Sequence, residues 1–534
     1  MARNGTLPPP WLHFFIITLL VLGIFFRFVN LDRKVFWLDE IATLRNISGY
    51  TDYQEALKGQ IITISDLHKH QRPDPEINVI DTVQNLAILD SHVSFLYHVI
   101  ARVWAEWFGS SVAVMRSLSA FISLLVFPCL YWLCRELFKS SVVGGVAVAL
   151  IAVSPFHVLY AQEVRMYSLH TVMILLSSAV LLRAIRVKSK LSWGLYAVGL
   201  SLSIYTNILS VFVAIAHGIY VTVIEGFRQS KVLVPYLIAT LVGLLTFLPW
   251  FFVIVTNHNQ VSNLIEWLNQ KISLPSLVTY WGINLSRIFL DLVPTYLNSS
   301  DTDADFSSFN NTWYISLITV LLIMVGYSIY FLCRHSSIQV WSFILTLIGV
   351  SALPLVLQDL ILGGIRSYTS RYLIAFYLGI HLAVAYLFAT KITLASAKLW
   401  QQKLWQIALV ALISYGVLSC VIISPAETWW NKRFGAENIK IARIVNQAKY
   451  PLLIVDNKNW KSMTLWSMND FLEPKVRLQL VAEQNISGIP DGFSDVFLFS
   501  PSEEFQDGLE KEHKVKIEPV FEGTLSLWKL EKLS

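Results

Sequence analysis

Two adjacent carboxylates, Asp39 and Glu40, follow the first long apolar run of the chain, in the stretch VFWLDEIATLRN. A carboxylate at the boundary of a membrane can accept a proton from an incoming hydroxyl group, so this pair could supply a general base. The competing interpretation is an ordinary solvated loop, because adjacent acids also occur by chance, as Glu503 and Glu504 do. The position of the pair in the fold must distinguish the two.

The composition is that of a membrane protein. Of the 534 residues, 55% are hydrophobic and 14% are charged, and the mean hydropathy is +0.55. Apolar runs of about 20 residues, long enough to cross a hydrocarbon core of roughly 30 Å, recur as far as residue 424. The formal charge of +5 is spread over short loops, which indicates topology signals and not a surface for nucleic acid.

We expect a mainly α-helical, multi-pass protein of the cell (inner) membrane with about eleven transmembrane helices. Cations gather in alternate loops, above all between Arg183 and Lys190. Positive loops stay in the cytoplasm, so the N-terminus is predicted to be cytoplasmic and the C-terminus outside. The predicted spans are 11–30, 113–134, 142–158, 166–183, 191–206, 208–225, 232–256, 312–333, 338–359, 371–390 and 403–424.

The outer face should receive two large loops, 31–112 and 257–311. Within the first loop, the stretch 92–108 contains His92, His98, Arg102 and Glu106, too many polar groups for a lipid-facing span, so we expect an interfacial helix. After the membrane domain 1–424, the charged tail 425–534 alternates a helical stretch with strand-like runs such as PLLIVD and DVFLFS. This pattern predicts a small α/β domain.

Carboxylates and arginines should meet at one membrane depth. The third predicted span ends outside in SPFHVLYAQEVRMYSL, which carries Glu163, Arg165 and Tyr167, and the tenth begins there with Arg371 and Tyr372. Charges near the hydrocarbon boundary often pair or bind a ligand. Because arginine matches phosphate oxygens with a planar fork, an anionic lipid head group would suit this cluster. Interfacial ion pairs and helix anchors are the simpler alternatives.

Four stretches resemble bacterial membrane glycosyltransferases of the protein O-mannosyltransferase and aminoarabinose-transferase type, in the GT-C class. They are RFVNLDRKVFWLDEIATL, LDSHVSFLYHVIARVWAEWFGSSVAVMRSLSAF, SPFHVLYAQEVRMYSL and SRYLIAFY, in the order in which that group has its motifs. The likeness is strong over residues 20–185, thinner as far as 390, and only general in the tail. One departure is Val93-Ser94, where the group has two prolines.

The resemblance implies transfer of a sugar, with inversion, from a polyprenyl-phosphate carrier to an acceptor hydroxyl at the outer face. Asp39 matches the acid that acts as general base, and Glu163 would orient the acceptor or hold Arg165. The donor phosphate would be bound by Arg371, Arg165 and Tyr372.

Four residues would support the acceptor side: Glu40, Tyr167, Asp90 and His92. No cofactor is required, although Glu40 could help to bind a divalent cation, since carboxylates suit hard metals. The acceptor could be a protein, a lipid or a glycan.

Two other function classes fit a polytopic chain. A lipid or solute transporter predicts pseudo-symmetric halves and ionisable groups near the middle of the membrane. This sequence shows no repeated half, and its charges collect at outer helix ends. A lipid-linked glycan ligase or polymerase shares the membrane setting and the outer-face site, and differs from a single-sugar transferase in the size of its donor.

Overall fold

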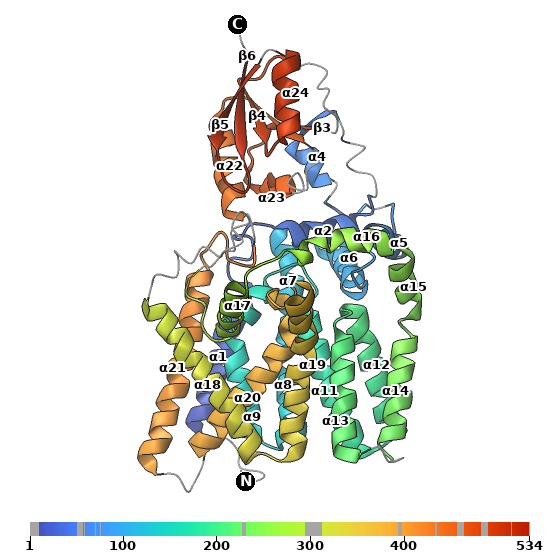
Figure 1. The fold of residues 1–534 in the computed structure, drawn as a ribbon, viewed down its shortest axis with the longest axis vertical. Coiled ribbons are helices and arrows are strands. Elements are labelled where there is room, and N and C mark those ends of the chain that lie inside the picture. The colour runs from blue at the N-terminus through green and yellow to red at the C-terminus, as the bar shows by residue number, and fades with distance from the viewer. Residues whose placement is uncertain are drawn as a thin grey trace.

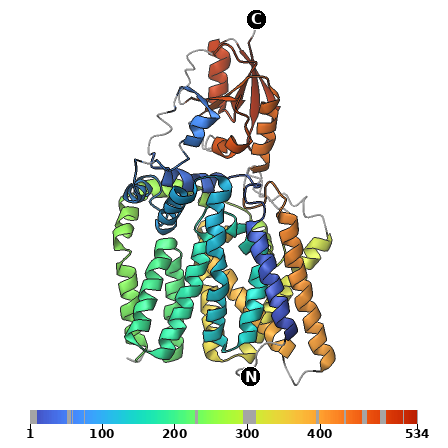
Figure 2. The ribbon, with the colours of Figure 1, turned by 180° about the vertical axis from the view of Figure 1, so that it is seen from behind.

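A computed structural model describes residues 10–50, 57, 59–69, 71–74, 76–226, 231–293, 312–393, 398–432, 435–456, 464–481, 490–513 and 515–532. A bundle of apolar helices forms one part, and a sheet with its own helices lies beyond one end of the bundle (Figure 1). Helix α1 starts at the far end of the bundle, and strand β6 lies in the sheet at the opposite end of the molecule (Figures 1 and 2).

The bundle consists of helices because a helix satisfies its own backbone hydrogen bonds and can therefore stand in hydrocarbon. Its helices are α1 (Pro10–Phe28), α7 (Val112–Leu124), α8 (Val126–Phe138), α9 (Ser141–Ala152), α10 (Pro155–Ala161), α11 (Tyr167–Val187), α12 (Lys190–Thr206), α13 (Ser210–Glu225), α14 (Leu233–Leu245), α15 (Leu248–Thr256), α18 (Thr312–His335), α19 (Ile338–Leu362), α20 (Ile374–Thr393, preceded by the 3-10 turn η3, Ser370–Leu373) and α21 (Leu399–Ile423).

Six described segments are long and apolar enough to cross a membrane, which agrees with a multi-pass protein. The number rises to eight if two bent pairs each count as one span: α9 with α10, bent by 62°, and α14 with α15, bent by 47°. Pro155 and Pro249 stand in the first turn of the second helix of each pair. Proline lacks the N–H that a continuous helix needs, which accounts for the bends.

The other three predicted spans are also helical, as α1, α12 and α13, with 19, 17 and 16 residues. Helices of 16 or 17 residues lie at the lower limit of the length that crosses a bilayer. A total of eleven spans therefore stays a prediction.

Short helices lie across the sheet-facing end of the bundle, where Figure 1 shows α2, α5 and α16 roughly perpendicular to the long helices. Helix α6 covers part of the stretch 92–108, and its 13 residues are about 20 Å long, too short to span. The elements at this end are α2 (Leu38–Ser48), α4 (Ile64–Lys69), α5 (Val79–Leu89), α6 (Leu96–Phe108), α16 (His258–Leu264), η1 (Glu266–Asn269) and α17 (Leu274–Ser286).

The tail forms helices and strands where its pattern predicts them. Most of the stretch AENIKIARIVNQAK lies in α22. The runs PLLIVD and DVFLFS contain β2 and β4, and the run LSLWKL overlaps β6. The elements are α22 (Gly435–Gln447), β2 (Pro451–Asp456), α23 (Leu465–Met468), η5 (Asn469–Phe471), β3 (Arg477–Val481), β4 (Asp495–Phe499), α24 (Glu503–His513), β5 (Val515–Phe521) and β6 (Leu527–Lys532).

The sheet has six strands in the order β1-β3-β2-β4-β6-β5. Strand β2 is parallel to both β3 and β4, and all six of its residues are buried, as expected for a parallel strand covered on both faces. Strand β1 (Ile61–Thr63) comes from the first predicted outer loop and pairs antiparallel with β3. The sheet thus joins residues on both sides of the predicted domain boundary at 424.

The two ends of the bundle should lie on opposite sides of the membrane. Lys188, at the end of α11 with the cationic loop, and Lys511, on α24, are both exposed. In a protein whose four cysteines are replaced by alanine, Lys511→Cys should react with an impermeant maleimide in intact cells. Lys188→Cys should react only after permeabilisation. Reaction of both from the same side would contradict the topology.

Candidate active site

Glu40 is completely buried and is held by two cations. Arg116, from α7, donates two hydrogen bonds to it, from Nε to Oε1 at 2.8 Å and from Nη2 to Oε2 at 2.7 Å. Lys432, in the segment after α21, donates from Nζ to Oε2 at 2.6 Å. The backbone N–H of Val164 donates to Oε1 at 3.1 Å. Both oxygens of Glu40 are therefore occupied, and the first turn of α2 is fixed by charge.

The charge on Glu40 is set by its partners. Burial favours the neutral acid, but Arg116 and Lys432 outweigh burial and lower the pKa of Glu40 to about 2. Arg116 also donates to the backbone oxygens of Leu31, Lys34 and Val35 at 2.7–2.9 Å, and so holds the segment that leads into α2.

Asp39, the neighbour of Glu40, points to a different set of groups. Its Oδ2 accepts a bond from the Tyr167 hydroxyl at 3.3 Å and lies 3.5 Å from Nη1 of Arg371. The side chains of Asp39 and Arg371 are 22% and 17% exposed, whereas that of Glu40 is 0% exposed. Asp39 is thus a carboxylate that an outside molecule can reach, and it stands beside a cation.

Arg371 is surrounded by aromatic rings. Its guanidinium carbon lies 5.6 Å from the centre of the Trp37 ring, 5.5 Å from that of Trp267 and 5.7 Å from that of Tyr372. Aromatic faces attract a guanidinium and leave its N–H groups free to bind an anion. The rings come from the start of α2, from η1 and from η3, so three distant segments position one cation.

Arg165 faces the backbone of α2. Its Nη1 donates to the carbonyl oxygen of Asp39 at 3.3 Å and to Oγ1 of Thr43 at 3.2 Å, and only 8% of the residue is exposed. The guanidinium therefore braces the helix that carries Asp39.

Glu163 is completely buried beside Glu40. Its Oε1 accepts a bond from Nδ2 of Asn431 and lies 3.9 Å from Nζ of Lys432, while Oε2 has no hydrogen-bond partner among the described atoms. Burial raises the pKa of Glu163 to about 7; Lys432 offsets part of this rise, and the nearby charges of Glu40 and Asp39 add to it. The charge on Glu163 therefore depends on the balance between burial and the cation of Lys432.

Asp90 and His92 lie at the other end of α2. Asp90 accepts a bond from Asn46 at 2.8 Å and lies 3.5 Å from Arg45 and 3.8 Å from His92. Burial lowers the pKa of His92, which favours the neutral ring. Asp39 thus stands at the start of α2, and the Asp90–His92 pair, which follows α5, contacts the same helix about 10 Å farther along, at Asn46.

The charged groups do not fit a divalent cation held by Glu40. A hard metal needs carboxylate oxygens that are free to coordinate it, and both oxygens of Glu40 already accept bonds from two cations and an amide. Within the described residues, no group of three or more His, Cys, Asp or Glu side chains could hold a metal ion.

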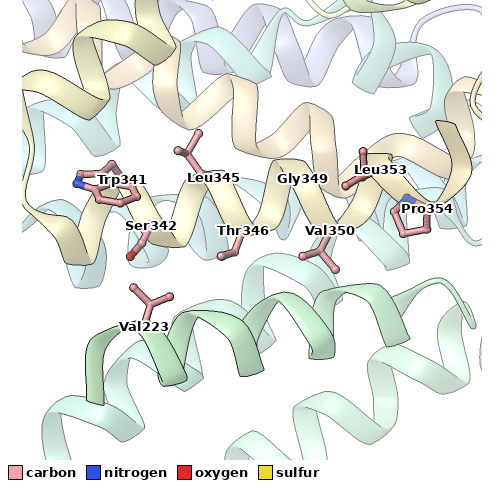
Figure 3. A pocket seen from close by; sticks show the side chains of 9 residues that line it. All are labelled: Val223, Trp341, Ser342, Leu345, Thr346, Gly349, Val350, Leu353 and Pro354. Atoms are coloured by element: carbon pink, nitrogen blue, oxygen red, sulfur yellow. The ribbon is translucent and has the colours of Figure 1, made fainter. Parts of the chain in front are cut away.

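An apolar cavity of about 450 Å³ lies between α13 and α19 (Figure 3). It is lined by Val223 on one side and by α19 from Trp341 to Pro354 on the other. It has no charged lining residue and shares none with the polar cluster. The chemistry of the site is therefore separate from this cavity.

Five further residues hold the cluster together and were not predicted from the sequence: Trp37, Arg116, Trp267, Asn431 and Lys432. A signal existed for Arg116, because a charge inside an apolar helix usually has a partner. Lys432 gave no such signal, since it lies in a charged segment where lysines are common.

Comparison with known proteins supports the resemblance read from the motifs. The family described as dolichyl-phosphate-mannose-protein mannosyltransferase matches residues 92–252. ArnT from Cupriavidus metallidurans bound to undecaprenyl phosphate has a similar structure, with 12% identity, a TM-score of 0.51, and coverage of 97% of this chain and 98% of ArnT. The apo state of the same ArnT gives 12% identity, a TM-score of 0.52 and 97% coverage of each chain. No curated protein sequence matches this chain.

These matches confirm the resemblance to GT-C transferases of the mannosyltransferase and aminoarabinose-transferase type, and the structural likeness shows a shared fold. The matched range 92–252 contains Arg116, Glu163 and Arg165 but neither Asp39 nor Arg371. The roles of the last two therefore depend on the geometry described above.

Removing the charge of Glu40 should destabilise the protein. Glu40→Gln leaves Arg116 and Lys432 buried without their shared anion, and breaking a buried ion pair in this way costs about 3–5 kcal/mol. We expect a clearly lower Tm in detergent. Glu427→Gln is the control, because Glu427 pairs with exposed Arg443 at 2.9 Å, and a surface pair is worth about 0–1 kcal/mol. Equal Tm values for the two variants would contradict the role of Glu40.

Proposed function

We propose that this protein is an inverting glycosyltransferase that moves a sugar from a polyprenyl-phosphate carrier to an acceptor hydroxyl at the outer face of the membrane. The observation that carries the proposal is the Asp39–Arg371 pair: a reachable carboxylate lies 3.5 Å from an arginine held by three aromatic residues. One group can take a proton and the other can bind a phosphate.

The donor phosphate would bind to Arg371. A guanidinium fork matches two phosphate oxygens, and the rings of Trp37, Trp267 and Tyr372 hold that fork in place. A phosphate would then replace Asp39 as the partner of Arg371. The structure of the ArnT relative with undecaprenyl phosphate supports a polyprenyl-phosphate donor for this chain as well.

The reaction would be a single displacement. Asp39 accepts the proton of the acceptor hydroxyl while the acceptor oxygen forms a bond to the anomeric carbon of the sugar. On the opposite face of the sugar, the bond to the phosphate oxygen breaks, and its electron pair leaves with the phosphate. Arg371 stabilises the charge that develops there. The products are the glycosylated acceptor, with inverted configuration, and the polyprenyl phosphate.

The neighbouring residues would divide into two groups. Tyr167 and Arg165 orient Asp39, since one binds its side chain and the other its carbonyl oxygen. Arg165 can assist Arg371 on the donor phosphate if its guanidinium turns outward. Asp90 and His92, which follow α5 and lie beside the far end of α2, would contact the acceptor, which could be a protein, a lipid or a glycan.

The topology that serves this reaction has eleven spans, a cytoplasmic N-terminus and the tail outside, in the cell (inner) membrane. The boundary near residue 424 would separate the membrane domain from a small outer α/β domain that borrows β1. Helices α2 and α6 would then lie in the outer interface and hold the site at the depth of the lipid head groups.

Asp39→Asn should abolish most transfer without loss of the donor site. The amide keeps the shape but cannot accept the proton, and general-base catalysis contributes about 10²–10⁴-fold. We expect turnover to fall by that factor in liposomes supplied with a polyprenyl-phosphate sugar, while donor binding stays near the normal level.

Asp32→Asn provides the matched control, because Asp32 is exposed and lies seven positions before Asp39. Near-normal transfer by Asp39→Asn would remove Asp39 from the reaction. A loss confined to Glu163→Gln would assign the base to Glu163.

Arg371→Lys tests the phosphate site. Lysine keeps the positive charge but loses the planar fork and its stacking, so affinity for the donor should fall by about tenfold or more, and Arg371→Ala should lose still more. Binding of a polyprenyl phosphate by titration calorimetry measures both. Unchanged affinity in both variants would reassign Arg371 to a purely structural role.

A further inference from the structure

Lys432 belongs to a segment that returns from α21, the last helix of the bundle, to the centre of the site. Helix α21 ends at Ile423, and two hydrogen bonds hold the backbone that follows it. Nε of Arg33 donates to the backbone oxygen of Pro425 at 2.7 Å, and the N–H of Val35 donates to the backbone oxygen of Glu427 at 2.8 Å. The indole N–H groups of Trp429 and Trp430 both donate to Asp291, at 2.8 and 2.7 Å.

The end of this segment inserts two polar side chains between two buried carboxylates. Lys432 is 1% exposed, with Nζ at 2.6 Å from Glu40 and 3.9 Å from Glu163. Asn431 donates to the same oxygen of Glu163 that faces Lys432. A lysine is rarely buried unless it is paired, so this placement requires the two acids.

The number of charges in the network indicates that Lys432 serves Glu163 as well as Glu40. Arg116 already neutralises Glu40 through two hydrogen bonds. The second cation, Lys432, therefore leaves one positive charge for Glu163. Without Lys432, an ionised Glu163 would face the anions Glu40 and Asp39 in a buried site, which favours its protonation.

We propose that Lys432, assisted by Asn431, is a positioning residue of the transferase site, which favours the ionised form of Glu163 and joins it to Glu40, so that the segment 424–432 is an integral part of the site. This inference rests on the proposed function only for its effect on transfer. The ion network itself can be tested without any activity.

Several ionisable groups surround Glu163, and any of them could contribute to its titration. Those whose charges act on Glu163, or are acted on by it, are Lys432, Glu40, Asp39, Arg371, Tyr97, Tyr160 and Tyr167. Among these groups, Lys432 is a cation whose Nζ lies 3.9 Å from Oε1 of Glu163, so its removal should have the largest effect.

The test measures the protonation of Glu163 by infrared spectroscopy across pH, with its carboxylic acid band identified by its loss in Glu163→Gln. In Lys432→Met the midpoint should rise by about one to three pH units, because a cation at this distance favours the ionised form by that amount. Asn431→Ala is a milder variant and should shift the midpoint in the same direction. Lys432→Arg should restore it toward the wild-type value.

Lys34→Met is the matched control. Lys34 is also buried, with 2% exposed, but its Nζ donates to Gln162 at 3.2 Å and not to an acid. Its replacement should leave the Glu163 midpoint unchanged. The inference is overturned if Lys432→Met leaves the midpoint where the wild type has it, or if Lys34→Met shifts it as much.

Transfer kinetics provide the second readout. Lys432→Met should lower kcat by about 10–100-fold through misplacement of the site, with donor KM changed by no more than about twofold. In the Glu163→Gln background the same change should have a much smaller effect, because coupled residues are not additive. If the losses of kcat in Lys432→Met and Glu163→Gln multiply in the double variant, Lys432 acts independently of Glu163 and has only a structural role. If the wild type transfers no sugar but the infrared midpoint shifts as expected, the donor assignment fails and the ion network stands.

Discussion

The buried carboxylate of Glu40 is the interaction on which the other parts of the site depend. It joins α2, α7, the α10–α11 link and the segment after α21 through bonds from Arg116, Val164 and Lys432. A buried charge is tolerated only when it is paired and hydrogen-bonded. This constraint forces four distant stretches of chain to meet at one point, and so fixes the place where α2 begins.

The adjacent residues Asp39 and Glu40 can have different tasks because they stand on a helix. Successive side chains on a helix point about 100° apart. Glu40 therefore points into the ion network, while Asp39 points toward Arg371 at the exposed edge. Because Glu40 is held rigidly, it fixes the position of the adjacent Asp39. A general base needs this, since catalytic groups act well only when their position is held.

Much of the fold follows from local sequence, and most of the ion network does not. Long apolar runs predicted the bundle helices, and in the tail a helical stretch followed by strand-like runs predicted α22, β2 and β4. The shared membrane depth of Asp39 and Arg371 suggested that they meet, although Asp39 lies in a helical turn and not in a loop. The contact of Glu40 with Lys432 could not be predicted, because 392 positions separate the two residues and no local pattern relates them.

The most direct test of the account is a structure of the protein with an unreactive polyprenyl-phosphate sugar and an acceptor hydroxyl. The account predicts the donor phosphate on the guanidinium of Arg371, between Trp37 and Trp267. It also predicts Asp39 within hydrogen-bond distance of the acceptor hydroxyl, on the opposite face of the anomeric carbon. A donor phosphate bound elsewhere, with Asp39 still 3.5 Å from Arg371 as in the free protein, would contradict it.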